Sequence, residues 1–246
     1  MLSLIYYLFL GGIGILFMAL SALVLVLAWP FDRARRCVHE LSRLLVRIFF
    51  AIPPRWRISV EGLEYVDRSK SYVIVMNHQA MSDIPALYFV PLNFRWVSKR
   101  EVFRIPLFGQ FLYLHGDICI DRGHAAEARE KLLQDGCRWI GRGASVAIFP
   151  EGTRSKDGQV HRFKSGAFEL ARQAGVEILP VVLDGTTTVV RKNHLFNWRN
   201  RLSVRVLAPE SPAAGPADLR EWAEQVRVRM AAAHDEQVAR RTNTNG

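Results

Sequence analysis

Two ionisable side chains in the stretch YVIVMNHQAMSD, residues 72–83, have the types and spacing for proton transfer. An apolar run of strand character is followed by His78 in a predicted turn and by Asp83 at a predicted helix start. In one continuous helix the two side chains would lie about 140° apart, but a strand-to-helix turn lets the carboxylate fold back towards the imidazole. The carboxylate would fix the ring tautomer, and the other ring nitrogen could accept a proton. Taken alone, so short a pattern is more often a helix N-terminus capped by Asn77 or Ser82.

The stretch VAIFPEGTRS, residues 146–155, combines groups that bind phosphate. An apolar strand ends in a turn where Gly152 permits close approach, and Arg154 with the hydroxyls of Thr153 and Ser155 can contact phosphate oxygens. The alternative is an ordinary strand-to-loop turn with solvated charges.

Two further cations, Lys99 and Arg122, each adjoin a predicted strand and could serve a bound phosphate or lie at the surface. The sequence has no nucleophile elbow, Walker loop, dinucleotide-binding glycine pattern or metal-ligand spacing. A His-Asp pair without a protein nucleophile indicates that a substrate hydroxyl is activated directly.

Alternating strands and helices must position these residues. The sequence predicts strands at 56–60, 72–76, 94–98, 117–121, 145–149, 177–183 and 201–207, and helices at 84–89, 125–140, 165–174 and 218–233. This order favours an α/β sandwich around a mixed, mostly parallel sheet. Residues 55–210 are predicted to form the catalytic domain, and 211–246 a C-terminal helix with a disordered tail from 240.

Residues 1–54 are predicted to anchor the chain to a membrane. No charged side chain occurs before Asp32, so residues 1–30 are predicted to form an apolar helix long enough to cross a bilayer. Residues 35–51 are predicted to form a basic amphipathic helix, which could lie on headgroups or pack on the domain. Clustered glycines at 11, 12 and 14 leave open whether the first helix spans the bilayer or enters one leaflet. The arginines after it place the remaining chain on the cytoplasmic side.

Composition is consistent with a membrane partner. The net charge is +10, and half of the 246 residues are hydrophobic, which suggests an anionic membrane surface or nucleic acid. The basic residues are dispersed and match no nucleic-acid-binding module, so no nucleic-acid partner is predicted. Cys37, Cys119 and Cys137 match no metal spacing and are predicted to be reduced thiols.

Four blocks in order, NHQAMSD, GDICIDR, FPEGTRS and ILPVVL, resemble the 1-acyl-sn-glycerol-3-phosphate (lysophosphatidate) acyltransferase family of glycerolipid acyltransferases. The likeness covers residues 57–207 and implies the αβ sandwich of that family, preceded by a membrane-associated helical segment. It also implies a general base at His78 and an orienting carboxylate at Asp83. Pro180 matches the acyl-donor side, and no metal is implied. Binding of the acceptor phosphate is assigned to Lys99, Arg122, Glu151, Gly152, Thr153 and Arg154. The sequence departs from the family pattern at Ala80 and Cys119, which affects expectations about acyl-chain and donor preference.

The implied reaction is acyl transfer from acyl-CoA or acyl carrier protein to the sn-2 hydroxyl of lysophosphatidate, giving phosphatidate without a cofactor. Backbone amides near residues 151 and 152 are the candidate oxyanion donors. The expected location is the cytoplasmic face of the inner or plasma membrane. Alternatives are acylation of another lysolipid or amino-lipid, a His-based hydrolase, and a non-catalytic basic protein that binds a membrane surface or nucleic acid.

Overall fold

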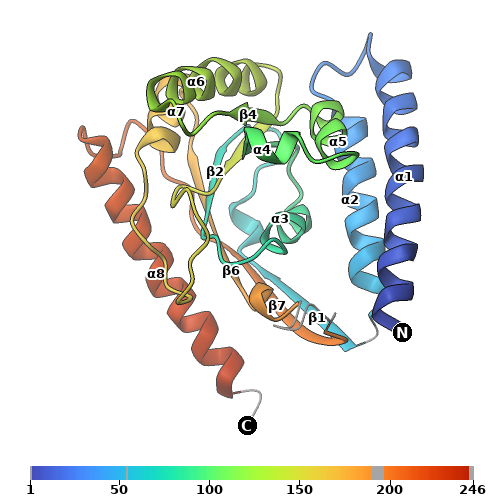
Figure 1. The fold of residues 1–246 in the computed structure, drawn as a ribbon. Helices are drawn as coiled ribbons and strands as arrows, with labels where there is room; N and C mark the ends of the chain where they lie inside the picture. Colours follow the sequence, from blue (N-terminus) through green and yellow to red (C-terminus); the bar gives the residue numbers. More distant parts are fainter. Residues whose placement is uncertain (1, 54, 190–196, 244–246) are drawn as a thin grey trace.

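A computed structural model describes residues 2–53, 55–189 and 197–243; for residues 2–10 and 243 only the backbone is described. Its centre is a seven-stranded sheet in the order β1-β7-β6-β2-β5-β3-β4 (Figure 1). The β6 and β7 strands pair antiparallel, and the other neighbours pair parallel. The strands are β1 Arg55–Glu61, β2 Val73–Met76, β3 Phe94–Lys99, β4 Ile118–Ile120, β5 Ser145–Ile148, β6 Ile178–Asp184 and β7 Arg199–Val206.

Helices cover both faces of the sheet. They are α1 Leu2–Ala28, α2 Arg36–Ala51, α3 Asp83–Ala86, α4 Arg100–Phe103, α5 Phe108–His115, α6 Ala125–Gly141, α7 Gly166–Ala174 and α8 Leu219–Asn243. Short 3-10 turns lie at Leu63–Tyr65, Leu87–Phe89 and Thr186–Thr188. The α6, α7 and α8 helices form one layer, whereas α2 and α3 cover the other face and α1 packs outside α2 (Figure 1).

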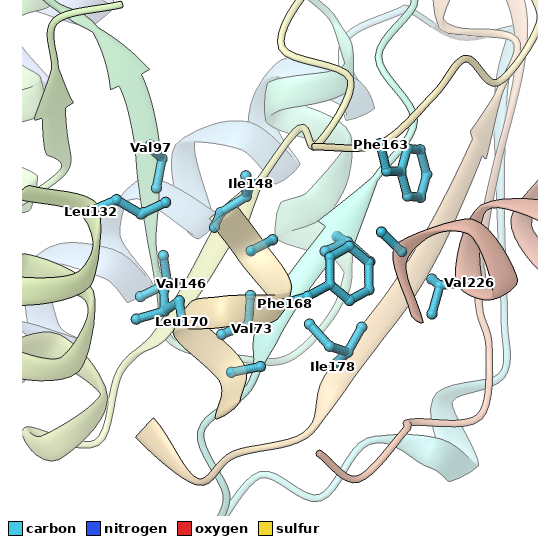
Figure 2. Packing of buried hydrophobic residues seen from close by; sticks show 14 of the residues in the cluster. Val73, Val97, Leu132, Val146, Ile148, Phe163, Phe168, Leu170, Ile178 and Val226 are labelled. Atoms are coloured by element: carbon cyan, nitrogen blue, oxygen red, sulfur yellow. The ribbon is translucent and has the colours of Figure 1, made fainter. Parts of the chain in front are cut away.

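The strand β2 is apolar throughout because both of its faces are buried. Val73 and Val75 belong to the cluster on the side of α6, α7 and α8. Figure 2 shows Val73 in this cluster with Phe168 and Val226. The intervening Ile74 and Met76 belong to a second cluster on the α2 and α3 side. The carboxyl end of β2 is therefore fixed from both sides, and the NHQAMSD turn starts from a rigid position.

The observed elements confirm all seven predicted strands and the mixed, mostly parallel sheet. The predicted elements do not include α4 and α5, which lie between the two cations Lys99 and Arg122. The prediction also ended α8 too early. That helix runs to Asn243, so the disordered tail is wrong for residues 240–243, while 244–246 lie outside the described residues.

The two N-terminal helices form an antiparallel pair at one edge of the domain (Figure 1). In the described part of the chain one helix, over Gly11–Ala28, is long and apolar enough to cross a membrane, with mean hydropathy 2.5 and 11% of the segment buried. The ring centroids of Phe17 and of Phe111 in α5 lie 5.9 Å apart, and Phe17 is buried, so α1 packs on the domain. Because Val38 and Phe50 of α2 are also buried, α2 packs on the domain as well, as one of the two interpretations of its sequence predicted.

Candidate active site

The structure brings His78 and Asp83 together at the carboxyl end of β2. The imidazole Nδ1 lies 2.7 Å from Asp83 Oδ2, and the Asp83 side chain is fully buried. The same oxygen accepts hydrogen bonds from the backbone N–H groups of Gln79 at 2.6 Å and Ala80 at 2.7 Å. With Nδ1–H donated to the carboxylate, Nε2 is the nitrogen that can accept a proton from a substrate.

Side chains on both sides of His78 hold the turn against β6 and the segment after it. The Asn77 amide donates to the carbonyl of Leu183 at 2.9 Å, and its oxygen accepts the Leu183 N–H at 2.8 Å. The Ser82 hydroxyl donates to the carbonyl of Thr186 at 2.7 Å. Asn77 thus continues the backbone pairing of β2 with β6 by one position and fixes where the turn begins.

Glu151 supports the turn from the loop that follows β5. It is buried, and its two carboxylate oxygens accept the backbone N–H groups of His78 at 3.0 Å and His161 at 3.2 Å. Burial raises the pKa of Glu151, whereas these two N–H groups act in the opposite direction. Its carboxylate is occupied by the backbone, and the side chain is not part of the cavity lining described below.

Two aromatic rings fix the plane of the His78 imidazole. Phe149 stacks on it with ring centroids 3.9 Å apart and 17° between the planes, and Trp96 stacks on Phe149 at 5.2 Å and 16°. Phe149 occurs in the quoted FPEGTRS block, but its apolar side chain carried no chemical signal. Trp96 lies on a different strand, and no local sequence pattern indicates that the two rings meet.

A cavity of about 220 Å³ lies in front of His78. Five of the residues assigned to the acceptor phosphate line it: Lys99, Arg122, Gly152, Thr153 and Arg154. Lys99 and Arg154 are exposed, and the guanidinium of Arg122 donates to the carbonyl of Gly152. Lys99, Arg122 and Arg154 therefore place three positive charges at the opening of the cavity. This arrangement is suited to a doubly charged phosphate.

An apolar cavity of about 280 Å³ adjoins the first and shares part of its wall. The shared residues are Met81, Ile84, Trp96, Phe108 and Leu112. From there the apolar cavity extends to Phe17 of α1 and to Leu45 and Val46 of α2. The cavity at His78 thus continues into an apolar one that reaches the N-terminal helices.

Two groups with predicted roles in donor binding and oxyanion stabilisation make other contacts in the structure. Pro180 is buried within β6, next to Val75 of β2, and does not line either cavity. The Gly152 N–H, one of the candidate oxyanion donors, already donates to the carbonyl of Phe149 at 3.1 Å. The roles of these two groups in donor binding and oxyanion stabilisation stay predictions.

A family model described as Acyltransferase matches residues 57–184, which is more than half of the chain. The chain belongs to the acyltransferase family. Its similarity to the sheep 1-acyl-sn-glycerol-3-phosphate acyltransferase alpha is 31% identity over 219 residues, covering 88% of this chain and 75% of that protein. The chloroplastic 1-acyl-sn-glycerol-3-phosphate acyltransferase LPAT1 of Arabidopsis thaliana is 36% identical over 162 residues, 65% of this chain and 45% of that protein.

This family member spans about half the length of the first curated relatives that it matches. Its fold is similar to that of a solved structure, the 1-acyl-sn-glycerophosphate (LPA) acyltransferase PlsC from Thermotoga maritima, with a TM-score of 0.71. That match covers 96% of both chains at 22% sequence identity. The likeness confirms the predicted acyltransferase-type αβ sandwich with its N-terminal helical segment.

Proposed function

We propose that the chain transfers an acyl group from a thioester donor, acyl-CoA or acyl carrier protein, to the sn-2 hydroxyl of lysophosphatidate. The observation that carries the proposal is the His78–Asp83 pair, 2.7 Å apart, at a cavity with cations at its mouth and an apolar extension behind it. Family membership and the names of the relatives support the reaction class and the acceptor.

The chemistry follows from which atoms are free. His78 Nε2 takes the proton of the acceptor hydroxyl as the hydroxyl oxygen attacks the thioester carbonyl carbon. The buried Asp83 carboxylate stabilises the imidazolium that forms. The tetrahedral intermediate collapses with cleavage of the C–S bond, and the imidazolium returns its proton to the leaving thiolate. A positioned base of this kind contributes about 10²- to 10⁴-fold in rate, and the step needs neither a metal nor a bound cofactor.

The cations select the acceptor. A phosphomonoester next to the reacting hydroxyl would contact Lys99, Arg122 and Arg154 at the mouth of the cavity. A zwitterionic lysolipid would bring its own positive charge to the same place. The charge of the mouth therefore favours lysophosphatidate over lysophosphatidylcholine.

The apolar cavity favours a substrate with a hydrocarbon chain. It starts beside His78 at Met81 and Ile84 and ends near α1, so an acyl chain bound there would keep its carbonyl at the base. Apolar side chains exposed along α1 would place the same end of the domain against lipid. We propose membrane attachment at the cytoplasmic face, because the arginines that follow α1 favour that side.

Acyl transfer is tested with labelled acyl-CoA and, separately, labelled acyl carrier protein. The acceptors are lysophosphatidate, lysophosphatidylcholine and glycerol-3-phosphate, and the variants are His78→Ala and, as a control, His124→Ala at an exposed position. Phosphatidate formation that is lost in His78→Ala and kept in His124→Ala supports the proposal. Use of another acceptor in preference to lysophosphatidate would overturn the assigned substrate, and full activity of His78→Ala would overturn the assigned base.

A further inference from the structure

A polar cavity of about 570 Å³ lies at the C-terminal end of α1, and we name it the arginine pocket. It shares no lining residue with the cavity at His78. Its walls come from the loop between α1 and α2 and from the end of α6. The lining residues are Trp29, Pro30, Asp32, Arg33, Arg35, Gly141 and Arg142.

Positive charge in the arginine pocket exceeds negative charge. Within residues 2–53, 55–189 and 197–243, the structure gives no ion pair to Arg33, Arg35 or Arg142. One carboxylate, Asp32, lines the pocket, and its Oδ2 accepts the backbone N–H of Cys37 at 2.7 Å. The C-terminal end of α6 adds a partial negative charge. Three guanidinium groups outnumber these negative groups.

Two of the three guanidinium groups in the pocket, those of Arg35 and Arg142, lie against one indole ring. The central carbons of Arg35 and Arg142 lie 5.4 and 5.2 Å from the centroid of Trp139, and those of Arg95 and Arg138 lie 4.9 and 6.0 Å from it. Burial lowers the pKa of Arg35, and the charges of Arg142 and Arg138 lower it further. An anion bound in the pocket beside Arg35 and Arg142 would relieve the repulsion between these two groups.

The loop that carries Arg33 and Arg35 has a fixed backbone. The carbonyl of Ala34 accepts hydrogen bonds from the guanidinium of Arg95 and from the Asn93 amide, the latter at 3.0 Å, and Arg95 also donates to the carbonyl of Arg35 at 3.1 Å. The side chain of Arg95 is completely buried. Arg35 itself has a φ of 48°, a left-handed conformation that arginine adopts only when its surroundings impose it. The pocket is therefore preformed.

The position of the pocket indicates where its anion comes from. Trp29 and Pro30 line it directly after the apolar helix ends at Ala28, and the side chains of Trp29 and Phe31 are 64% and 90% exposed. Exposed aromatic rings beside an apolar helix end are typical of the headgroup region of a bilayer. A phosphate bound at this depth would therefore belong to a lipid.

We propose that the arginine pocket binds the phosphate of an anionic membrane phospholipid and so fixes the domain on the bilayer surface. Arginine suits this ligand because its guanidinium donates two parallel hydrogen bonds to phosphate oxygens and carries a permanent charge. The pocket acts on attachment, separately from the acyl-transfer site.

The test measures binding of the full chain to vesicles of phosphatidylcholine alone and of phosphatidylcholine mixed with phosphatidylglycerol. The variant is Arg33→Gln/Arg142→Gln. Its matched control, Arg68→Gln/Arg220→Gln, removes the same charge at two exposed positions outside the pocket. We expect the extra affinity given by phosphatidylglycerol to fall about tenfold in the pocket variant and less than about twofold in the control. Arg33→Lys/Arg142→Lys should keep only part of that affinity, because lysine retains the charge but cannot donate the paired hydrogen bonds.

Three results would overturn the proposal. Equal losses in the pocket and control variants would show a diffuse charge attraction. A similar loss on pure phosphatidylcholine would show damage to apolar insertion. Displacement of the phosphatidylglycerol-dependent binding by inorganic phosphate, at an ionic strength matched with chloride, would assign the pocket to a soluble phosphate. Turnover of detergent-dispersed substrate should stay unchanged in the pocket variant, which separates this proposal from the acyl-transfer one.

Discussion

At the residue scale, replacing Asp83 tests whether its carboxylate orients the His78 ring and stabilises its protonated form. Its Oδ2 accepts three hydrogen bonds, from the His78 ring and from two backbone N–H groups. In Asp83→Asn the amide keeps one oxygen acceptor but removes the charge that stabilises an imidazolium. We expect kcat to fall by about 10²- to 10⁴-fold with a small change in the acceptor KM, measured by steady-state kinetics. Asp67→Asn, at an exposed turn, is the control. An unchanged kcat in Asp83→Asn would remove the carboxylate from the mechanism.

We expect the cations at the cavity mouth to act on acceptor binding rather than on proton transfer. Arg122→Gln and Arg154→Gln each remove one charged donor from the phosphate, a loss of about 1.5–3 kcal/mol. We expect the KM for lysophosphatidate to rise about tenfold or more in each variant, with kcat changed less. Arg104→Gln, at an exposed position outside the cavity, should leave both constants as they are. A fall in kcat at constant KM would argue that these cations act on the transition state alone.

At the scale of elements, the α4–α5 hairpin shapes the cavity through one glycine. A Cβ at Gly109 would overlap the carbonyl oxygen of Phe103 in α4, so α5 can lie at its observed distance only with glycine there. We expect Gly109→Ala to lower the free energy of unfolding by about 1–3 kcal/mol and to raise the KM for long-chain donors, because Leu112 of α5 moves. Gly141→Ala, where nothing lies within 4 Å of the added methyl, should not destabilise the chain. Thermal unfolding of both variants checks this expectation.

A second His-Asp pair joins α2, α5 and β3 in the interior. His115 Nδ1 lies 2.7 Å from Asp117 Oδ1, and its Nε2 lies 3.1 Å from His39 Nδ1 on α2. Both histidines are fully buried. Burial lowers the pKa of each ring, and the charge of Arg95 acts in the same direction, while Asp117 raises the pKa of His115. The pair is a structural connection between the N-terminal helices and the sheet.

These depressed pKa values make folding sensitive to acid. Above pH 6.5 the rings are neutral in both the folded and the unfolded chain. Below it the unfolded chain takes up protons that the folded chain does not, so stability falls by up to about 1.4 kcal/mol per pH unit for each ring. We expect the unfolding midpoint of His39→Leu to decline less steeply between about pH 7 and pH 5 than that of the parent. His124→Leu, at an exposed ring, should follow the parent curve. Parallel curves for His39→Leu and the parent would contradict this account.

Features that depend on residues close together in the sequence were predicted, whereas contacts between residues far apart in the sequence were not. The strands and the His78–Asp83 pair were found because hydrophobic periodicity and a five-residue spacing are local. The α5 helix was missed, although FGQFLYLH has helical apolar spacing, because the preceding Leu107 starts it from a positive φ after Pro106. Trp96, Phe149 and the His39–His115 contact come from separate elements, and a single sequence carries no information about which strands become neighbours.

At the scale of the whole molecule, the apolar helix and the reaction cavity form one continuous apolar region. Phe17 of α1 lines the apolar cavity that begins beside His78, and the outer face of α1 exposes Leu16, Leu23 and Val26. A lipid substrate could therefore pass from the bilayer to the base without crossing water. The proposed membrane attachment by α1 and the proposed lipid acylation at His78 would both follow from this packing.

The exposed face of α1 can be tested independently of its buried face. Leu16 and Leu23 are 70% and 53% exposed, so Leu16→Lys/Leu23→Lys leaves the contact of Phe17 with Phe111 in place. Each lysine should weaken partitioning into neutral phosphatidylcholine vesicles by about tenfold or more, because moving a charged side chain into hydrocarbon costs about 3 kcal/mol. Val228→Lys, at a similarly exposed apolar position on α8, should bind as the parent does. Detergent-dispersed lysophosphatidate should still be acylated by the α1 variant, because its cavity is intact. Full vesicle binding by that variant would mean that another surface attaches the chain, and loss of turnover in detergent would mean that α1 serves the fold of the site itself.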